Sequence, residues 1–394
     1  MLTFSRVPLP WLNLTHDKLR LVARVLGTAF AVFLLFVELG FWDALLRASV
    51  QLIEQFNGPL IVVSQANYSL VIKEPFPRRY LAQTRAVAGV QDVFPVYLEH
   101  PAALWKDTSV ARAERTASQP IRVIAFNPDQ PVLDNPAITK YHNALKVPYN
   151  VLLDSKSKKQ SYGEIKAGID RELAGHAVHV AGLFTLGADF ANDGNVIMSA
   201  ETYGRLFSDD KPPERVLESV DLGVVQIAPG ADPQAICQTL RQILPPEVRV
   251  FTKDEFKRRE REYWSKTTPM GFIFFLGLCV GFIVGGVICY QIISTDVAEH
   301  LPQFATLKAM GYRDAFLNGV VLSEALWLAL LGFVPGLGMS WLSYQWLNRE
   351  TGMSLELSWF SVLLVLFLTI VMCVASGLVA LRKVRMADPA EVFA

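Results

Sequence analysis

The residues of this sequence that could carry out chemistry are few and widely separated. No G-x-x-x-x-G-K-[ST] motif occurs, so the usual ATP-binding loop is missing. The H-E-x-x-H, C-x-x-C and G-x-S-x-G motifs are also absent. His176 and His179 are the nearest pair of histidines, but a strand would place them on opposite faces. We therefore predict no catalytic residues, no metal site and no bound cofactor on this chain, which is not expected to be an enzyme.

Two carboxylates fall in or beside long apolar runs, namely Glu38 and Glu324. A carboxylate inside a bilayer is costly, so it is a functional candidate by default. One interpretation gives these groups a role with a proton or a substrate. The simpler one is a boundary position or a hydrogen bond between helices.

The apolar runs themselves indicate a membrane protein. Hydrophobic residues make up 52% of the chain and charged residues 19%, against about 25% charged in typical globular domains. No charged residue lies in 267–295, 325–348 or 357–381, and each stretch exceeds the roughly 20 residues that cross a bilayer. The balance of 37 basic and 37 acidic residues gives no reason to expect nucleic-acid binding.

A fourth apolar run, from Leu21 to Leu45, is interrupted by Glu38. A signal peptide is the competing interpretation, but a small-residue cleavage site should then follow. The residues that follow are Phe41-Trp42-Asp43, so we predict a retained transmembrane helix.

Basic residues near the first and last runs predict the orientation, because they concentrate on the cytoplasmic side. These are Lys18, Arg20, Arg24, Arg382, Lys383 and Arg385. We expect a multi-pass protein of the plasma (inner) membrane with both termini in the cytoplasm. The expected parts are a cytoplasmic segment (1–20), four transmembrane helices (21–45, 267–295, 318–347 and 358–381), a periplasmic domain with its stalk (46–266), a cytoplasmic loop (296–317), a short periplasmic loop (348–357) and a cytoplasmic tail (382–394).

The large domain between the first two spans shows a mixed α/β pattern. A strand at 60–63, a helical pattern around Tyr80 and a strand at 90–97 form one unit. The order recurs in a strand at 220–227, a helix opening at Asp232-Pro233 and a strand at 248–251. Two such strand–helix–strand units predict a ferredoxin-like layer, so the domain reads as two ferredoxin-like halves.

Two further segments complete the domain. The middle, about 100–215, contains strand-like runs at 121–126 and 178–184, which predict an inserted β-rich subdomain. The run 253–262 mixes both charge signs at helical spacing, which is typical of a solvated helix. We interpret it as a polar stalk, and the same features would suit a stalk that carries force.

Small residues recur at helical spacing in the second and third spans. Such spacing lets helix backbones approach closely in lipid. The sequence does not decide whether the contact is within one chain or between two, and we expect a homodimer through the first and second helices. The residues are Gly277, Gly281, Gly285, Gly332 and Gly336.

The predicted cytoplasmic loop contains a short amphipathic helix. Leu307 and Met310 can share one face with Phe304 alongside, and Gly311 fits the residue just past a helix end. An ordinary interfacial helix is one interpretation, and a helix that docks in a groove of a cytoplasmic partner is the other.

Several short motifs resemble one family of membrane proteins. The run 306–312 (Thr-Leu-Lys-Ala-Met-Gly-Tyr) and the end 386–393 (Met-Ala-Asp-Pro-Ala-Glu-Val-Phe) are similar to FtsX/MacB/LolC-type (type VII, mechanotransmission) ABC transporter permeases. Within that superfamily the chain resembles most the cyanobacterial DevC permeases, through Pro8-Leu-Pro-Trp-Leu12, Leu39-Gly-Phe41 and the stretch from Val180 to Gly194. Glu38 departs from this pattern, which usually has Gln.

This resemblance implies a homodimer that recruits two copies of a separate ABC ATPase, on which ATP and Mg²⁺ would be bound. Motion would pass through a coupling helix into the second span and the stalk, and thence to the periplasmic domain. A periplasmic membrane-fusion adaptor, a TolC-like outer-membrane duct and membrane lipids are the other implied partners. Glycolipids or other hydrophobic molecules are the implied cargo. The coupling residues would be Glu299, Phe304, Leu307, Lys308, Met310 and Gly311.

Two other classes of function remain open at this stage. An FtsX-like regulator or scaffold, which would control a periplasmic cell-wall hydrolase, uses the same architecture. A receptor or sensor would require a cytoplasmic output domain, and the predicted terminal segments are too short for one.

Overall fold

The computed structural model describes residues 18–107, 118–208, 212–351 and 355–386. The resemblance motif at 8–12, and the motif at 386–393 apart from Met386, therefore lie outside the described residues. The chain divides into two compact units. We call residues 1–43, 272–347 and 355–394 the membrane unit, and residues 44–271 and 348–354 the sheet unit.

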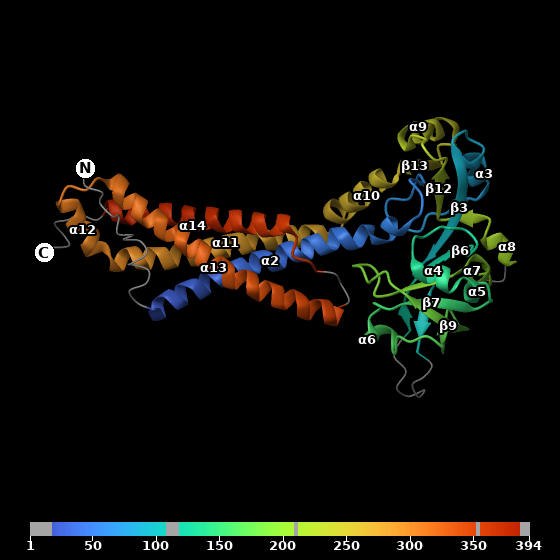
Figure 1. The fold of residues 1–394 in the computed structure, drawn as a ribbon, viewed down its shortest axis with the longest axis horizontal. Coiled ribbons are helices and arrows are strands. Elements are labelled where there is room, and N and C mark those ends of the chain that lie inside the picture. Colours follow the sequence, from blue (N-terminus) through green and yellow to red (C-terminus); the bar gives the residue numbers. More distant parts are fainter. Residues whose placement is uncertain (1–17, 108–117, 209–211, 352–354, 387–394) are drawn as a thin grey trace. The chain divides into compact units, whose positions relative to one another are not determined.

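The membrane unit is built from four long apolar helices (Figure 1). Each is long and apolar enough to cross a bilayer, which confirms the prediction of four such helices. A short helix, α12, follows the second of them. The bounds are α2 (Lys18–Gln55), α11 (Pro269–Glu299), α12 (Leu301–Ala309), α13 (Asp314–Thr351) and α14 (Trp359–Met386).

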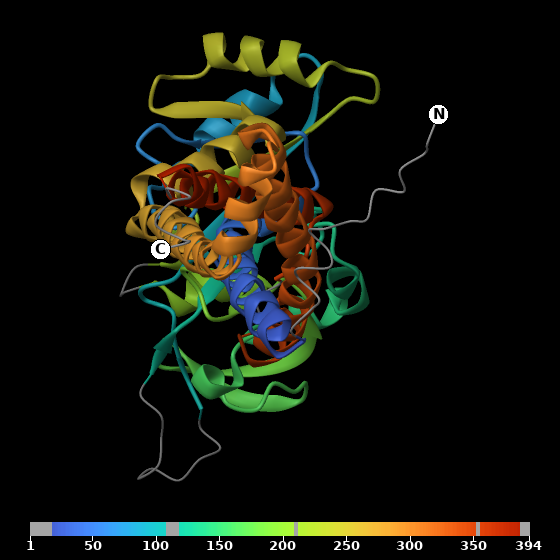
Figure 2. The same cartoon turned by 90° about the vertical axis from the view of Figure 1, so that its left-hand side faces the viewer.

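One side of helix α2 is buried against its neighbours in this bundle, and Val22, Leu26 and Phe30 on its other side are exposed. Ala29, Val32, Leu35 and Phe36 are fully buried, and Figure 2 shows the blue α2 among the orange and red helices. The hydroxyl of Tyr344 on α13 donates a hydrogen bond to the carbonyl oxygen of Phe36. Buried side chains on a membrane helix indicate helix–helix contacts in place of lipid contacts, so this side of α2 packs against other helices.

Exposed aromatic side chains lie near one end of the bundle. Trp346 at the end of α13 is 63% exposed, and Trp359 and Phe360 at the start of α14 are 76% and 72% exposed. Aromatic rings of this kind favour the boundary between lipid and water. We infer that these residues lie at one interface of the membrane.

The sheet unit contains an 11-stranded sheet whose first four strands run in the order β13-β1-β12-β3. Neighbouring strands in this part are antiparallel. Helix α3 links β1 to β3 and α9 links β12 to β13, so the predicted strand–helix–strand pair is confirmed as a ferredoxin-like layer. The bounds are β1 (Leu60–Ser64), α3 (Arg79–Arg85), β3 (Val90–Glu99), β12 (Leu222–Ile227), α9 (Pro233–Ile243) and β13 (Val248–Thr252).

The middle of the chain extends this sheet and does not form a separate one. The first part of β3 pairs with β12, and its last residues, Tyr97 to Glu99, pair with β6. The order continues β6-β10-β7-β9-β8-β4-β5, with parallel and antiparallel pairs. We call residues 100–217 the insert. Its strands are β4 (Leu104–Lys106), β5 (Gln119–Pro120), β6 (Arg122–Phe126), β7 (Asn150–Asp154), β8 (Ile169–Leu173), β9 (His176–Phe184) and β10 (Asn195–Ser199).

The insert also carries short helices, so it is less purely β than predicted. A separate ribbon of two short strands, β2 and β11, lies beside the ferredoxin-like layer. The bounds are α4 (Pro136–Lys140), α5 (His142–Leu145), α6 (Lys159–Tyr162), α7 (Ala200–Leu206), α8 (Pro213–Val216), β2 (Phe76–Pro77) and β11 (Ser219–Val220).

Both faces of β1 are buried, because successive side chains point to opposite sides of a sheet. Leu60 and Val62 join the core beneath α3 and α9. Ile61 and Val63 join a second core that contains Ile53 from the end of α2. This burial explains why α2 continues to Gln55, beyond the predicted end of the first span at residue 45.

The charged helix α10 (Lys253–Glu262) is not solvated all round, contrary to the sequence interpretation. Thr252 and Glu255 form a capping box at its start. Phe256 and Glu260, four residues apart on one face, are each only 1% exposed. A turn of π-helix (Tyr263–Thr267) follows, and extended backbone at Thr268 separates it from α11.

Candidate functional site

The loop between α11 and α13 folds into a well-defined helix with a sharp end. His300 interrupts the helix after Glu299, and α12 restarts at Leu301 with Pro302 in its first turn. At the other end Gly311 has φ +89°, and the amides of Gly311 and Tyr312 donate to the carbonyl oxygens of Lys308 and Leu307, at 3.0 and 3.1 Å. This pair of bonds is a Schellman motif, so the predicted position of Gly311 just past the helix is confirmed.

The predicted shared face of Leu307 and Met310 is wrong. Leu307 packs against the buried core of the membrane unit, whereas Met310 is 63% exposed. The reason is that the helix ends between them, since Met310 is the C-cap residue. The outward side of α12 carries Gln303 and Thr306, and the predicted Phe304 lies within the same helix.

An ion-pair cluster connects the end of α11 to the start of α2. Arg24 Nη1 lies 2.5 Å from Asp296 Oδ1, and Arg20 Nη1 lies 2.5 Å from Glu299 Oε2. Only 13% of the Arg24 side chain and 8% of the Asp296 side chain are exposed. His300 also approaches Asp296, through Nδ1 at 3.6 Å. We call these five residues and α12 the loop junction.

Burial makes the loop junction stiff. Removing one member of a buried ion pair leaves an uncompensated charge, at a cost of about 3–5 kcal/mol. The pair between Arg24 and Asp296 therefore fixes the end of α11 against α2. The sequence named Glu299 as a coupling residue and used Arg20 and Arg24 only to predict the orientation, because nothing in the spacing of the residues shows which helix ends meet.

The glycines of α11 make contacts within the chain. A Cβ at Gly277 would overlap the Glu38 carboxylate, and one at Gly285 would lie 2.6 Å from Met372 Sδ and 3.1 Å from Ala31 Cβ. The corresponding position at Gly281 faces Leu35 of α2 at 3.9 Å. Within the described residues these glycines contact α2 and α14 of the same chain, and the homodimer through the first and second helices stays a prediction.

The glycines of α13 contact a different set of α2 residues. A Cβ at Gly332 would lie 2.6 Å from Thr28 Cβ, and one at Gly336 would lie 2.7 Å from Val32 Cβ and 2.8 Å from the carbonyl oxygen of Ala29. Close backbone approach of this kind is how helices pack in lipid. Helix α2 consequently packs against both α11 and α13.

The two membrane carboxylates have different surroundings. Glu38 is partly exposed and rests against the backbone of Gly277, which has room for it because it lacks a side chain. Glu324 is 6% exposed on α13. A role of either group with a proton or substrate stays a prediction.

A second set of contacts joins the last turns of α2 to the rest of the sheet unit. The side-chain amide of Gln51 donates to the carbonyl oxygen of Leu186, and that of Gln55 donates to Thr185 at 3.2 Å. Lys253 Nζ donates to the carbonyl oxygens of Glu54 and Phe56, both at 2.8 Å. The sequence pointed to 180–187 only through a family resemblance and gave no partner for it.

The segment 185–194 is itself held by buried polar groups. Asp154 is fully buried and accepts hydrogen bonds from the amides of Leu186 and Gly187, at 3.1 and 2.7 Å. The side-chain amide of Asn195 also donates to Asp154, at 2.8 Å. Arg122 pairs with Asp189 at 2.6 Å. These contacts fix the conformation of the segment 185–194. The side chains of Gln51 and Gln55 therefore bind carbonyl groups that are held in place.

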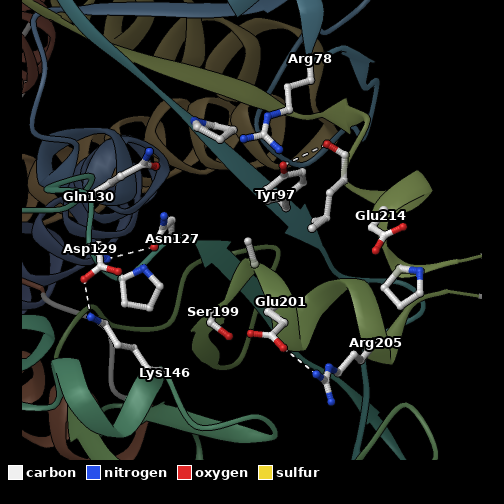
Figure 3. A pocket seen from close by; sticks show the side chains of 15 residues that line it. Arg78, Tyr97, Asn127, Asp129, Gln130, Lys146, Ser199, Glu201, Arg205 and Glu214 are labelled. Atoms are coloured by element: carbon white, nitrogen blue, oxygen red, sulfur yellow. Dashed lines mark hydrogen bonds and ion pairs between the residues drawn. The ribbon is translucent and has the colours of Figure 1, made fainter.

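The sheet unit also has a cavity of about 620 Å³ between the ferredoxin-like layer and the insert (Figure 3). Its charged side chains largely neutralise one another, with Lys146 2.5 Å from Asp129 and Arg205 2.6 Å from Glu201. The hydroxyl of Tyr97 donates to the carbonyl oxygen of Leu217 at 3.1 Å. A cavity with internally paired charges offers little to a strongly charged small ligand. The spacing of residues in the sequence did not predict this cavity.

The histidine pair does not form a metal site in the structure. His176 and His179 are both exposed on β9, and His179 Nδ1 lies 2.7 Å from Asp170 Oδ1. Among the described residues no group of three or more His, Cys, Asp or Glu side chains is placed to hold a metal ion.

Comparisons with known proteins find a family similarity for part of the chain. Residues 272–389 match the family described as FtsX-like permease C-terminal. The periplasmic region of MacB from Actinobacillus actinomycetemcomitans is 11% identical, with 52% of this chain and 92% of that one covered and a TM-score of 0.35. The extracellular domain of the noncanonic ABC-type transporter YknZ from Gram-positive bacteria is 9% identical, with coverage of 49% and 99% and a TM-score of 0.32. Both TM-scores are too low to support an inference. No curated protein matches the sequence.

Proposed function

We propose that this chain, which belongs to the FtsX/MacB/LolC superfamily of ABC transporter permeases through its FtsX-like domain, is the permease subunit of an exporter. ATP and Mg²⁺ are then bound by a separate ABC ATPase. The observation that supports this proposal is the loop junction. It combines a short capped helix with a buried ion pair that fixes the preceding span.

The exposed side of α12 is the proposed contact with the ATPase. Met310 and Tyr312 are 63% and 47% exposed, and the ring of Tyr312 lies 4.9 Å from that of Phe316. An exposed apolar cluster at the end of a helix suits insertion into a groove of a partner. Because Leu307 packs inward and Asp296 is paired with Arg24, a push on α12 moves α11 and α2 together.

The remaining parts of the proposal concern partners and cargo. A second copy of the chain would pack against the outward stripe of α11, where Phe272, Leu276, Val280 and Ile283 are exposed. A periplasmic adaptor would bind the sheet unit and connect to a TolC-like duct, as in DevC-type systems. Motion of the sheet unit would then expel a glycolipid or other hydrophobic cargo, with both termini in the cytoplasm.

The test is a pull-down of the tagged full chain from native membranes, with the bound proteins identified by mass spectrometry. The variant Met310→Glu/Tyr312→Glu places two charges on the exposed cluster without touching Leu307. Glu262→Gln, on the exposed side of α10, is the control. We expect the parent and the control to retain a P-loop ATPase and an adaptor, and the double variant to lose the ATPase alone.

Other outcomes would change the proposal. A parent chain that retains a cell-wall hydrolase, with no adaptor, would show a regulator of the FtsX kind in place of an exporter. An ATPase bound equally by the parent and the double variant would place its contact elsewhere than α12. ATP hydrolysis by the purified chain alone would overturn the idea of a separate ATPase.

A further inference from the structure

A buried carboxylate lies next to the junction between α10 and α11. Glu260 is 1% exposed, and it accepts hydrogen bonds from Ser69 Oγ at 2.6 Å, from the amide of Leu70 at 3.2 Å and from Trp264 Nε1 at 3.0 Å. Three donors on one carboxylate make up for much of the water that it loses on burial. Burial is nevertheless the largest influence, and it raises the pKa of Glu260 to about 6.

Two of these donors belong to a turn-rich segment after β1, residues 67–73, which we call the strap. The side-chain amide of Asn67 donates to the carbonyl oxygen of Ile72 at 3.0 Å, which closes the strap on itself. The guanidinium group of Arg259 donates to the carbonyl oxygen of Asn67. Ser69 is fully buried. Helix α10 thus holds the near end of the strap through two consecutive residues.

The far end of the strap contacts the insert. The ammonium group of Lys73 donates to Glu99, at the end of β3, and to the hydroxyl of Tyr203 at 3.1 Å. Tyr203 is 3% exposed on α7 and stacks on Tyr97 with ring centroids 5.4 Å apart. The strap therefore connects α10 with a buried part of the insert.

The third donor belongs to the π-turn that precedes α11. Trp264 is 8% exposed, and its carbonyl oxygen accepts a hydrogen bond from Thr268 Oγ1 at 2.6 Å. Thr268 is extended and directly precedes α11. One carboxylate consequently holds both the π-turn and the strap.

We propose that Glu260 is a positioning residue through which displacement of the π-turn reaches the strap and, by way of Lys73, the insert. The source of the displacement rests on the proposed function, but the connection itself does not. A rigid α10 also pushes on β1 and β13 through Phe256, which shifts the ferredoxin-like layer. The strap adds a route that bypasses this layer and ends on α7.

The test is hydrogen–deuterium exchange of the full chain in nanodiscs, read for the amide of Leu70 and for peptides of α7. Glu260→Ala removes the acceptor, so we expect the exchange of the Leu70 amide to rise about tenfold or more, as for a lost hydrogen bond of about 1.4 kcal/mol. Glu260→Gln keeps an acceptor oxygen and should restore most of the protection. Glu262→Gln is the control on the same helix.

Titration separates positioning from general stability. After correction for intrinsic rates, exchange at Leu70 in the parent should change through about pH 6, whereas Glu260→Gln should show no such step. Asp189, which is paired with Arg122, is the other acidic group that raises the pKa of Glu260. Should Glu260→Ala fail to fold, Trp264→Phe removes one donor from the π-turn and leaves the carboxylate in place.

The insert is then followed with the co-purified ATPase and ATP. We expect ATP to change the exchange of α7 in the parent and in Glu260→Gln, and not in Glu260→Ala. An unaltered ATP response in Glu260→Ala, or unaltered exchange at Leu70, would overturn the inference while leaving the permease proposal intact. If no ATPase is found but Glu260→Ala raises exchange in both the strap and α7, the connection stands and the proposed function fails.

Discussion

The two units of this protein are each stabilised internally by a different kind of contact. In the membrane unit, Gly332 and Gly336 bring the backbone of α13 against α2, and the cost of an added methyl group would be a steric overlap. In the sheet unit, Asp154 is fully buried and is held by donors from three separate segments. One unit depends on the absence of side chains and the other on hydrogen bonds to buried polar groups.

The solvent explains this contrast. Lipid offers apolar side chains as good an environment as the protein interior does, so helices gain stability chiefly from close packing. In water, burial of apolar side chains drives folding, and a buried carboxylate is tolerated only when donors replace its water. The same class of substitution should therefore have different effects in the two units.

The largest effect is expected at Asp154. Asp154→Ala removes the acceptor for three backbone amides and for the side chain of Asn195, and each donor left unpaired costs about 1–3 kcal/mol. We expect the free energy of unfolding of the full chain in detergent to fall by about 3 kcal/mol or more. Asp170→Ala, at a side chain that is 79% exposed, is the control and should change it little. A small effect at Asp154 would contradict the idea that polar satisfaction holds the sheet unit.

A smaller effect is expected at Gly336. A Cβ there would lie 2.8 Å from the carbonyl oxygen of Ala29, which is backbone and cannot rotate away. Gly336→Ala should lower stability in detergent by about 1–3 kcal/mol, as overpacking does elsewhere. A Cβ at Gly338 would meet no atom of the described chain within 4 Å, so Gly338→Ala should leave the melting temperature unchanged or slightly higher. Equal effects of the two variants would refute close packing against α2.

A pH dependence is expected from the sheet unit. Burial raises the pKa of Asp221 to about 6. Because the folded state holds this proton more tightly than the unfolded state does, the contribution to stability is complete below about pH 4. It is lost as the pH rises through about 6. Asp221→Asn should therefore flatten the pH dependence of chemical unfolding between pH 4 and 7, by at most about 3 kcal/mol. An unaltered slope would show that Asp221 is not protonated in this range.

The smallest effect is expected on the surface of the sheet unit. Glu201 and Arg205 form an ion pair at 2.6 Å, four residues apart on α7, and both side chains are well exposed. Such pairs contribute about 0.3–0.5 kcal/mol. Glu201→Gln should lower the free energy of unfolding in low salt by an amount within this range, and by less in high salt. A change above 1 kcal/mol would mean that the neighbouring cavity depends on the pair.

Local signals in the sequence predicted much of this fold. Three uncharged runs, and a fourth apolar run that Glu38 interrupts, predicted the four long helices, because a helix must reach a minimum length to cross a bilayer. Asp232-Pro233 predicted the start of α9, where the Asp232 side chain does accept hydrogen bonds from the amides of Gln234 and Ala235. Gly311 predicted the end of α12 for the same kind of reason, because a left-handed residue is needed there.

Such local signals could not predict contacts between segments that are far apart in the sequence. The change of partner along β3, from β12 to β6, depends on pairing between strands far apart in the chain. Charge alternation in α10 hid the buried Glu260, because its donors lie near residue 70. The ion pair of Arg24 with Asp296 likewise depends on which helix ends meet.

The position of β1 in the sheet has a consequence for how the chain folds as it is made. Leu60 pairs with Val225 on one side and with Thr252 on the other, so both partners leave the ribosome long after β1. Contacts of this separation form slowly, whereas strands β6, β7 and β10 are close together in sequence. The insert can thus acquire structure first, while the apolar run 60–63 waits unpaired. That interval is when this protein is most exposed to misassembly, and when a chaperone would help it most.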